Sequence, residues 1–168
     1  MNYYNEVFSL FEELELVFDA KATLGEGPCW DSEQQLLYWV DILEKKVNIF
    51  NPDTKENREI QLEQYVGAMA LKNSNEAVLA LENGFYHLHL ETEKVTPLEE
   101  VERQLPNTRF NDGKCDAYGR FWAGTMNTRY GTEEGALYCL HNGKVEKKLD
   151  KVGLSNGLAW SPDNKLLY

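Results

Sequence analysis

The chain has 168 residues, of which 28 are acidic and 17 basic, so its formal net charge is −11. That charge repels the phosphates of nucleic acids, and we expect no nucleic-acid partner. A hydrophobic content of 42%, with 12% aromatic residues, excludes a disordered chain and predicts a globular fold with a substantial core.

The first residues do not fit the pattern of a secretory signal. Glutamates occur at positions 6, 12, 13 and 15, and the segment has neither a basic region nor an unbroken apolar stretch. No later segment approaches the roughly 18 apolar residues of a membrane span, so we expect no membrane partner. We predict an N-terminal extension over residues 1–13, with at most a short helix in residues 7–16, and one domain over residues 14–168.

A strand–turn–strand pattern recurs four times in the domain. Its copies begin at Gly27, Ala68, Gly113 and Gly157, which lie 41, 45 and 44 residues apart. Each copy has a strand of small or apolar residues, a polar turn, and a second strand rich in Leu, Tyr, Trp and Val. Further strand and turn signals occupy the segments between the copies, so each period holds about four strands.

A period of 40 to 50 residues with four strands is typical of a β-propeller. An all-β sandwich also places turns every 8 to 12 residues, but it does not repeat the same order of elements in register. Residues 27–168 hold about 3.2 repeats, fewer than the four to eight blades of closed propellers. We therefore expect a truncated all-β propeller whose exposed blade faces and edges favour instability or self-association.

Oxygen-bearing side chains precede the first strand of three copies. Glu26, the pair Asn111 and Asp112, and Asn156 all stand just before a glycine that begins the strand. Equivalent positions of a propeller meet at one mouth, so we expect these side chains to converge. Glu, Asn and Asp favour Ca²⁺, Mg²⁺ or Mn²⁺, and carboxylates leave Zn²⁺ open. The simpler alternative for Glu26 alone is a turn residue.

Arg109 stands two residues before Asn111, so on an extended strand both side chains point to one side. Arg109 can bind a carboxylate or a hydroxyl-rich ligand, while Asn111 offers a donor and an acceptor. The alternative for Arg109 is an ion pair with an acidic neighbour at the surface. We expect Phe110, which faces the other way, to lie in the core.

Three cysteines are present, Cys29, Cys115 and Cys139, without a Cys-x-x-Cys pair. This number and spacing favour neither a disulfide framework nor a zinc knuckle. Cys29 and Cys115 share a repeat position that alanine occupies in the other copies, so we expect packed, unreactive thiols. These features suit a reducing compartment, and we expect a cytoplasmic protein.

Six short motifs, in this order and spacing, resemble the SMP-30/gluconolactonase/regucalcin family. They read Gly-Glu-Gly-Pro at 25–28, Leu-Leu-Tyr-Trp-Val-Asp-Ile at 36–42, Arg-Phe-Asn-Asp-Gly-Lys at 109–114, Ala-Gly-Thr-Met at 123–126, Gly-Ala-Leu-Tyr at 135–138 and Ser-Asn-Gly-Leu-Ala-Trp-Ser at 155–161. The resemblance extends from about residue 14 to residue 168.

The resemblance implies a six-bladed β-propeller, of which this chain would hold about three to three and a half blades. It implies one divalent cation (Ca²⁺, Zn²⁺, Mn²⁺ or Mg²⁺) at the channel mouth and hydrolysis of a sugar lactone such as glucono-1,5-lactone. Glu26 and Asn156 match metal ligands of the family, and Arg109 and Asn111 match its substrate-positioning pair. The family's third ligand, an aspartate that is also the general base, would fall after Tyr168, so we expect the fragment alone to be inactive.

The sequence leaves two points of function open. Some family members carry an acidic substrate contact soon after the Ala-Gly-Thr-Met motif, where this chain has Asn127, Thr128 and Arg129. The substrate preference is therefore open. The leading hypothesis is a metal-dependent sugar lactonase, and the alternatives are a calcium-binding or regulatory propeller without turnover and a propeller that only binds protein partners.

Overall fold

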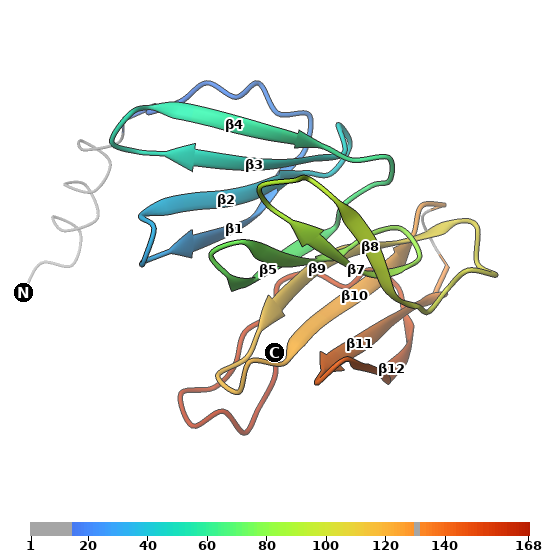
Figure 1. Cartoon of the computed structure of the whole chain (residues 1–168). Helices are drawn as coiled ribbons and strands as arrows, with labels where there is room; N and C mark the ends of the chain where they lie inside the picture. Colours follow the sequence, from blue (N-terminus) through green and yellow to red (C-terminus); the bar gives the residue numbers. More distant parts are fainter. Residues whose placement is uncertain (1–14, 130–131) are drawn as a thin grey trace, which may run out of the picture.

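The computed structural model describes residues 15–129 and 132–168, and the predicted N-terminal extension lies outside them. The described residues form three four-stranded antiparallel sheets, one after another along the chain (Figure 1). Blade 1 comprises β1 (Gly25–Asp31), β2 (Leu36–Asp41), β3 (Lys46–Asn51) and β4 (Glu56–Gln61). Blade 2 comprises β5 (Ala68–Asn73), β6 (Glu76–Ala80), β7 (Gly84–His89) and β8 (Val95–Glu100). Blade 3 comprises β9 (Thr108–Cys115), β10 (Phe121–Asn127), β11 (Gly135–His141) and β12 (Lys144–Val152).

The prediction of an all-β repeat is confirmed. In every blade the strands pair in chain order, so each blade is a meander. The first three predicted hairpins correspond to β1–β2, β5–β6 and β9–β10. The fourth copy forms a shorter hairpin closed by a bridge between Trp160 and Leu167.

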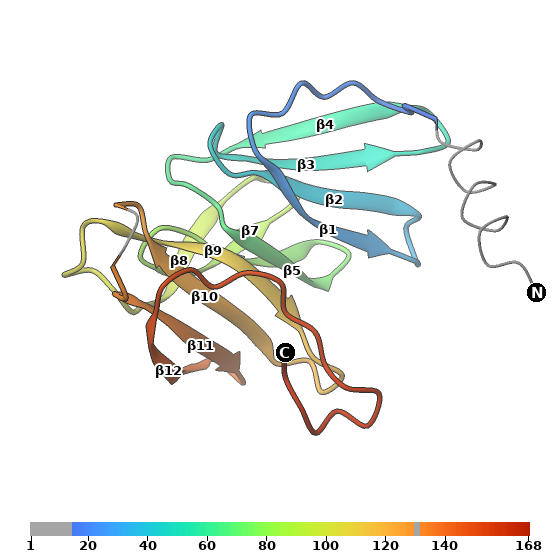
Figure 2. The same ribbon diagram turned by 180° about the vertical axis from the view of Figure 1, so that it is seen from behind.

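The first strands of the three blades lie side by side, with β1 against β5 and β5 against β9 (Figure 2). Gly67, just before β5, shows how close this approach is. A Cβ atom at Gly67 would lie 2.3 Å from the carbonyl carbon and oxygen of Phe110. No side chain fits in that space. Glycine, which has none, therefore lets the starts of successive inner strands come together.

Two apolar layers hold the blades together. Between blades 1 and 2, alternate residues of β2 and β3, among them Tyr38 and Val47, pack on residues such as Leu79 of β6. Between blades 2 and 3, the ring of Phe85 lies 4.9 Å from that of Phe110 and 5.8 Å from that of Phe121, centroid to centroid. Each such fully buried side chain stabilises the fold by about 1.5–3 kcal/mol. Phe110 therefore lies in the core, as predicted.

The outermost strand of each blade is polar. β4, β8 and β12 carry exposed charged side chains, and Lys46 of β3 pairs with Glu59 of β4 at 2.8 Å. Charged outer strands keep sheet edges soluble, because they discourage pairing with another chain. No helix suited to crossing a bilayer occurs in residues 15–129 and 132–168.

Asp116 organises the turn between β9 and β10. One carboxylate oxygen accepts hydrogen bonds from the backbone amides of Tyr118 and Arg120, at 2.9 and 3.0 Å. The other accepts from the Arg120 guanidinium at 2.5 Å and from the Trp122 indole at 2.9 Å. Burial alone would raise the pKa of Asp116, but these hydrogen bonds outweigh it and lower the pKa.

We predict that Asp116→Asn destabilises the chain by about 2 kcal/mol at pH 7, because hydrogen bonds to a buried charged group are lost. Since the folded-state pKa is lowered, the stabilisation is complete above the unfolded-state pKa of about 3.9 and is lost as the pH falls through the folded-state value. Urea unfolding at a series of pH values measures this. Asp53→Asn, in the exposed turn after β3, is the control. A stability difference that stays constant down to acidic pH would contradict the assignment.

Candidate functional site

Glu26 lies near the start of β1, with its side chain exposed to solvent. The backbone before it is fixed by Asp41 of β2, whose carboxylate accepts hydrogen bonds from the amides of Thr23 at 2.8 Å and Leu24 at 3.0 Å. Asp41 is itself buried. A buried carboxylate thus sets the path of the chain just before Glu26, while the Glu26 side chain stays accessible to a ligand.

Arg109 and Asn111 lie on β9, on the same side of the strand, as predicted. The Arg109 guanidinium Nη1 donates to the Asn111 side-chain oxygen at 3.0 Å and to the Phe110 carbonyl at 2.8 Å. Arg109 is only 8% exposed, so its side chain is buried rather than spread over the surface. The pair forms a rigid donor group on the innermost strand of blade 3.

The segment that carries Asn156 is fastened to β9 on both sides of that residue. Nδ2 of Asn111 donates to the carbonyl of Ser155 at 2.9 Å. Oδ2 of Asp112 accepts from the amide of Gly157 at 2.7 Å. Asn156 itself is exposed. The structure therefore brings Arg109, Asn111 and the Asn156 segment together at the inner edge of blade 3.

The Ala-Gly-Thr-Met motif of β10 has a structural role at this site. A Cβ atom on Gly124 would lie 1.9 Å from the Ser155 hydroxyl oxygen. The missing side chain leaves room for the buried Ser155 to sit against β10. Gly124 thus allows the segment that contains Asn156 to pack against β10.

A buried carboxylate that the sequence did not single out lies in the linker from blade 2 to blade 3. Oε1 of Glu102 accepts hydrogen bonds from the hydroxyls of Thr125 at 3.0 Å and Tyr138 at 2.9 Å. Burial, together with the charge of Glu102, raises the pKa of Tyr138, so this hydroxyl remains a hydrogen-bond donor. Glu102 therefore ties the linker that leads to Arg109 to β10 and β11.

The thiols of Cys29 and Cys115 are poor nucleophiles because burial keeps them protonated. Burial raises the pKa of the Cys115 thiol to about 11, although part of this residue is exposed, and burial also raises the pKa of Cys29. A thiol with such a pKa is protonated at neutral pH and is a poor nucleophile. Cys115 is more exposed than the prediction of a packed residue implied.

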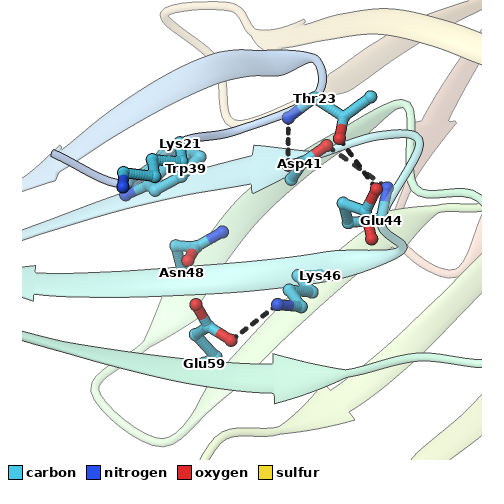
Figure 3. A pocket seen from close by; sticks show the side chains of 9 residues that line it. Lys21, Thr23, Trp39, Asp41, Glu44, Lys46, Asn48 and Glu59 are labelled. Carbon is cyan, nitrogen blue, oxygen red and sulfur yellow. Dashed lines mark hydrogen bonds and ion pairs between the residues drawn. The ribbon is translucent and has the colours of Figure 1, made fainter.

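A polar hollow of about 210 Å³ lies elsewhere, on the face of blade 1 that points away from blade 2 (Figure 3). Trp39, Asn48 and Glu59 line it from three successive strands, together with Lys21 and Thr23. Glu26, Arg109, Asn111 and Asn156 do not line it. The hollow is therefore separate from the candidate site.

The donor chemistry of the candidate site fits a hard divalent cation. Glu26 offers carboxylate oxygens and Asn156 an amide oxygen, both on exposed side chains. Within the described part of the chain, no group of three or more His, Cys, Asp or Glu side chains is arranged to hold a metal. Glu26 and Asn156 are thus candidates for part of a ligand set.

These features define a class. The inner strands of blades 1 and 3, and the segment after β12, carry oxygen-bearing side chains at equivalent repeat positions, an arrangement that suits a β-propeller with a polar mouth. Residues 24–168 match the family model described as SMP-30/Gluconolactonase/LRE-like region, and the chain belongs to this family.

Comparisons with individual proteins agree. The chain is 40% identical over 151 residues to YvrE of Bacillus subtilis (strain 168), assigned by name to the sugar lactone lactonases, covering 89% of this chain and 52% of YvrE. It is 40% identical over 162 residues to regucalcin of Xenopus laevis, covering 93% of this chain and 54% of that protein. The chain thus spans about half the length of the curated relatives it matches.

Solved structures give the same picture. A luciferin-regenerating enzyme is 33% identical with a TM-score of 0.82, over 88% of this chain and 52% of that one. Regucalcin of Agrobacterium tumefaciens, described as a calcium-binding protein, is 29% identical with a TM-score of 0.81, over 85% and 48%. These structures confirm the predicted propeller fold and family.

We predict that Gly124→Ala displaces Ser155 and costs about 1–3 kcal/mol of stability through overpacking. Gly153→Ala is the matched control, since a Cβ atom at Gly153 meets no atom within 4 Å. Urea unfolding gives the stability of each variant, and hydrogen exchange of the 154–158 peptide reports the displacement. Equal behaviour of the two variants would contradict the role of Gly124.

Proposed function

We propose that the protein hydrolyses a sugar lactone to the aldonic acid and that a divalent cation at the mouth assists the reaction. The observation that carries this proposal is the fastening of the Asn156 segment to β9. Hydrogen bonds from Asn111 and to Asp112 bring a metal-ligand candidate to the strand that carries the substrate-binding candidates. The lactonase name of a 40% identical relative supports the reaction class.

In this proposal Glu26 and Asn156 supply two of the ligands. When bound, a divalent cation polarises the lactone carbonyl and stabilises negative charge on its oxygen. The remaining ligand and the general base are assigned to no residue of the described chain.

Arg109 and Asn111 orient the lactone. The Arg109 guanidinium is held by the Phe110 carbonyl and by Asn111, so it presents its donors in a fixed direction. Asn111 donates one amide hydrogen to the Ser155 carbonyl, and its side-chain oxygen accepts one hydrogen bond from Arg109. Its side chain has a second amide hydrogen and a second oxygen lone pair for a ligand. A hydroxyl-rich ring matches this mixture of donors and acceptors.

Calcium binding without turnover is the second candidate. It is favoured by the similarity to the Agrobacterium tumefaciens regucalcin, which is described as a calcium-binding protein. The oxygen donors of Glu26 and Asn156 suit calcium as well as Mg²⁺ or Mn²⁺. The two candidates differ in whether a lactone is consumed.

The proposal predicts that the full-length gene product hydrolyses gluconolactone and loses the activity on chelation. Adding back Mn²⁺, Zn²⁺ or Ca²⁺ should restore it. Glu26→Gln and Asn156→Ala should each lower kcat/KM on the order of 100-fold, since each removes a ligand of the charge-stabilising group. Metal binding without hydrolysis would favour the regulatory candidate, and metal-independent hydrolysis would contradict the proposal.

Arg109→Lys tests the substrate pair separately. Lysine keeps the charge but replaces the planar set of donors with one ammonium nitrogen, which cannot both donate to Phe110 and Asn111 and present further donors to a ligand in a fixed plane. We expect KM for gluconolactone to rise about tenfold or more while Mn²⁺ affinity is unchanged, a loss of about 1.4 kcal/mol. Calorimetric titration with Mn²⁺ is the control measurement. An unchanged KM would remove Arg109 from the substrate site.

A further inference from the structure

Asp112 was expected among the converging oxygen-bearing side chains but was given no role of its own, and in the structure it contacts the Asn156 segment directly. Its Oδ2 accepts the amide hydrogen of Gly157 at 2.7 Å, across 45 positions of sequence. Its Oδ1 accepts the amide hydrogen of Gly113 at 2.7 Å. Both carboxylate oxygens of Asp112 therefore accept hydrogen bonds from backbone amides, one on β9 and one on the Asn156 segment.

The Asn156 segment has few other hydrogen bonds that would fix its backbone. Gly157 has a φ of +72°, in the left-handed region that favours glycine. Asn156 and Gly157 are exposed, and around them the chain forms only isolated bridges, Met126 with Leu154 and Trp160 with Leu167. Water competes for the backbone groups of an exposed segment of this kind. A hydrogen bond to a carboxylate is about twice as strong as one between neutral groups, so Asp112 fixes the segment better than a neutral acceptor would.

Asp112 and Asn111 act on opposite sides of Asn156. Asn111 binds the carbonyl of Ser155 at 2.9 Å, and Asp112 binds the amide of Gly157. With both neighbours fixed, the direction in which the Asn156 side chain leaves the backbone is fixed as well. Asp41 makes the corresponding contacts before Glu26, with the amides of Thr23 and Leu24. An aspartate therefore holds a backbone amide within two residues of each ligand candidate.

We propose that Asp112 is a positioning residue that, by binding the Gly157 amide, holds Asn156 in the orientation needed to ligate a divalent cation. The inference rests on the proposed function, because it assumes that Asn156 is a ligand. Residues that orient a metal ligand through hydrogen bonds typically change metal affinity 10- to 100-fold when they are removed. Asp112 would act in this way through the backbone, without contacting the cation.

The test measures Mn²⁺ affinity of the full-length gene product by calorimetry, for the parent, Asp112→Ala and Asp112→Asn. We expect Asp112→Ala to weaken binding about 10- to 100-fold. The isosteric Asp112→Asn should fall between it and the parent, because asparagine keeps one acceptor oxygen in place of two and an amide oxygen is a weaker acceptor than a carboxylate oxygen. Hydrogen exchange of the 154–158 peptide should accelerate in the same order. Asp53→Asn is the control with the same charge change, in the exposed turn after β3.

The results separate this inference from the function on which it rests. Unchanged Mn²⁺ affinity in both Asp112 variants, with normal binding by the parent, would overturn the positioning role and leave the proposed function intact. Failure of the parent to bind Mn²⁺, Ca²⁺ or Zn²⁺ would overturn both. If Asp112→Ala does not fold, the affinity of Asp112→Asn decides the matter, since it preserves the shape of the side chain.

Discussion

The close contact between successive inner strands is the constraint on which the rest of the structure depends. β1 lies against β5 and β5 against β9, and at Gly67 the approach leaves no space for a side chain beside the Phe110 backbone. Blades that were further apart would separate the apolar layers that hold Phe85 against Phe110 and Phe121. The same contact sets the starts of the inner strands in a row. Glu26, Arg109 and Asn111 lie in the first half of β1 and β9, whereas Asn156 lies on the segment after β12.

Two aspartates fix the backbone near the candidate metal ligands. Asp41 holds the backbone before Glu26, and Asp112 holds the backbone after Asn156. In each case the aspartate binds amides while the neighbouring side chain stays exposed. The division is physically reasonable: a carboxylate that accepts two amide hydrogens is a rigid support, and an exposed Glu or Asn remains accessible to a cation. The acidic composition of the chain thus includes structural carboxylates as well as solvated ones.

Much of the fold could be predicted from the sequence because the strand–turn–strand pattern recurs in register. The sequence predicted the polar turns between β1 and β2, between β5 and β6, and between β9 and β10. It also predicted that Phe110 lies in the core. The outermost strands β4, β8 and β12 were much harder to locate, since their exposed charged residues show little apolar alternation. Edge strands are selected for solubility, which weakens the periodic signal.

The candidate site residues could be proposed from the sequence, but the contacts that support them could not. The equivalent positions of Glu26, Asn111 and Asn156 follow from the repeat, whereas the contact between Asp112 and Gly157 joins blade 3 to the segment that follows it and depends on loop geometry. The role of Gly124 was equally hidden, because it depends on where Ser155 packs. Long-range contacts of this kind have no local sequence pattern.

The central claim is that Glu26 and Asn156 bind one divalent cation at the propeller mouth. Anomalous diffraction from crystals of the full-length gene product soaked in Mn²⁺ tests it most directly. The account predicts one ion whose distances to a Glu26 carboxylate oxygen and to the Asn156 side-chain oxygen are both about 2.0–2.6 Å. An ion bound away from these two residues, with the mouth empty at saturating Mn²⁺, would contradict it.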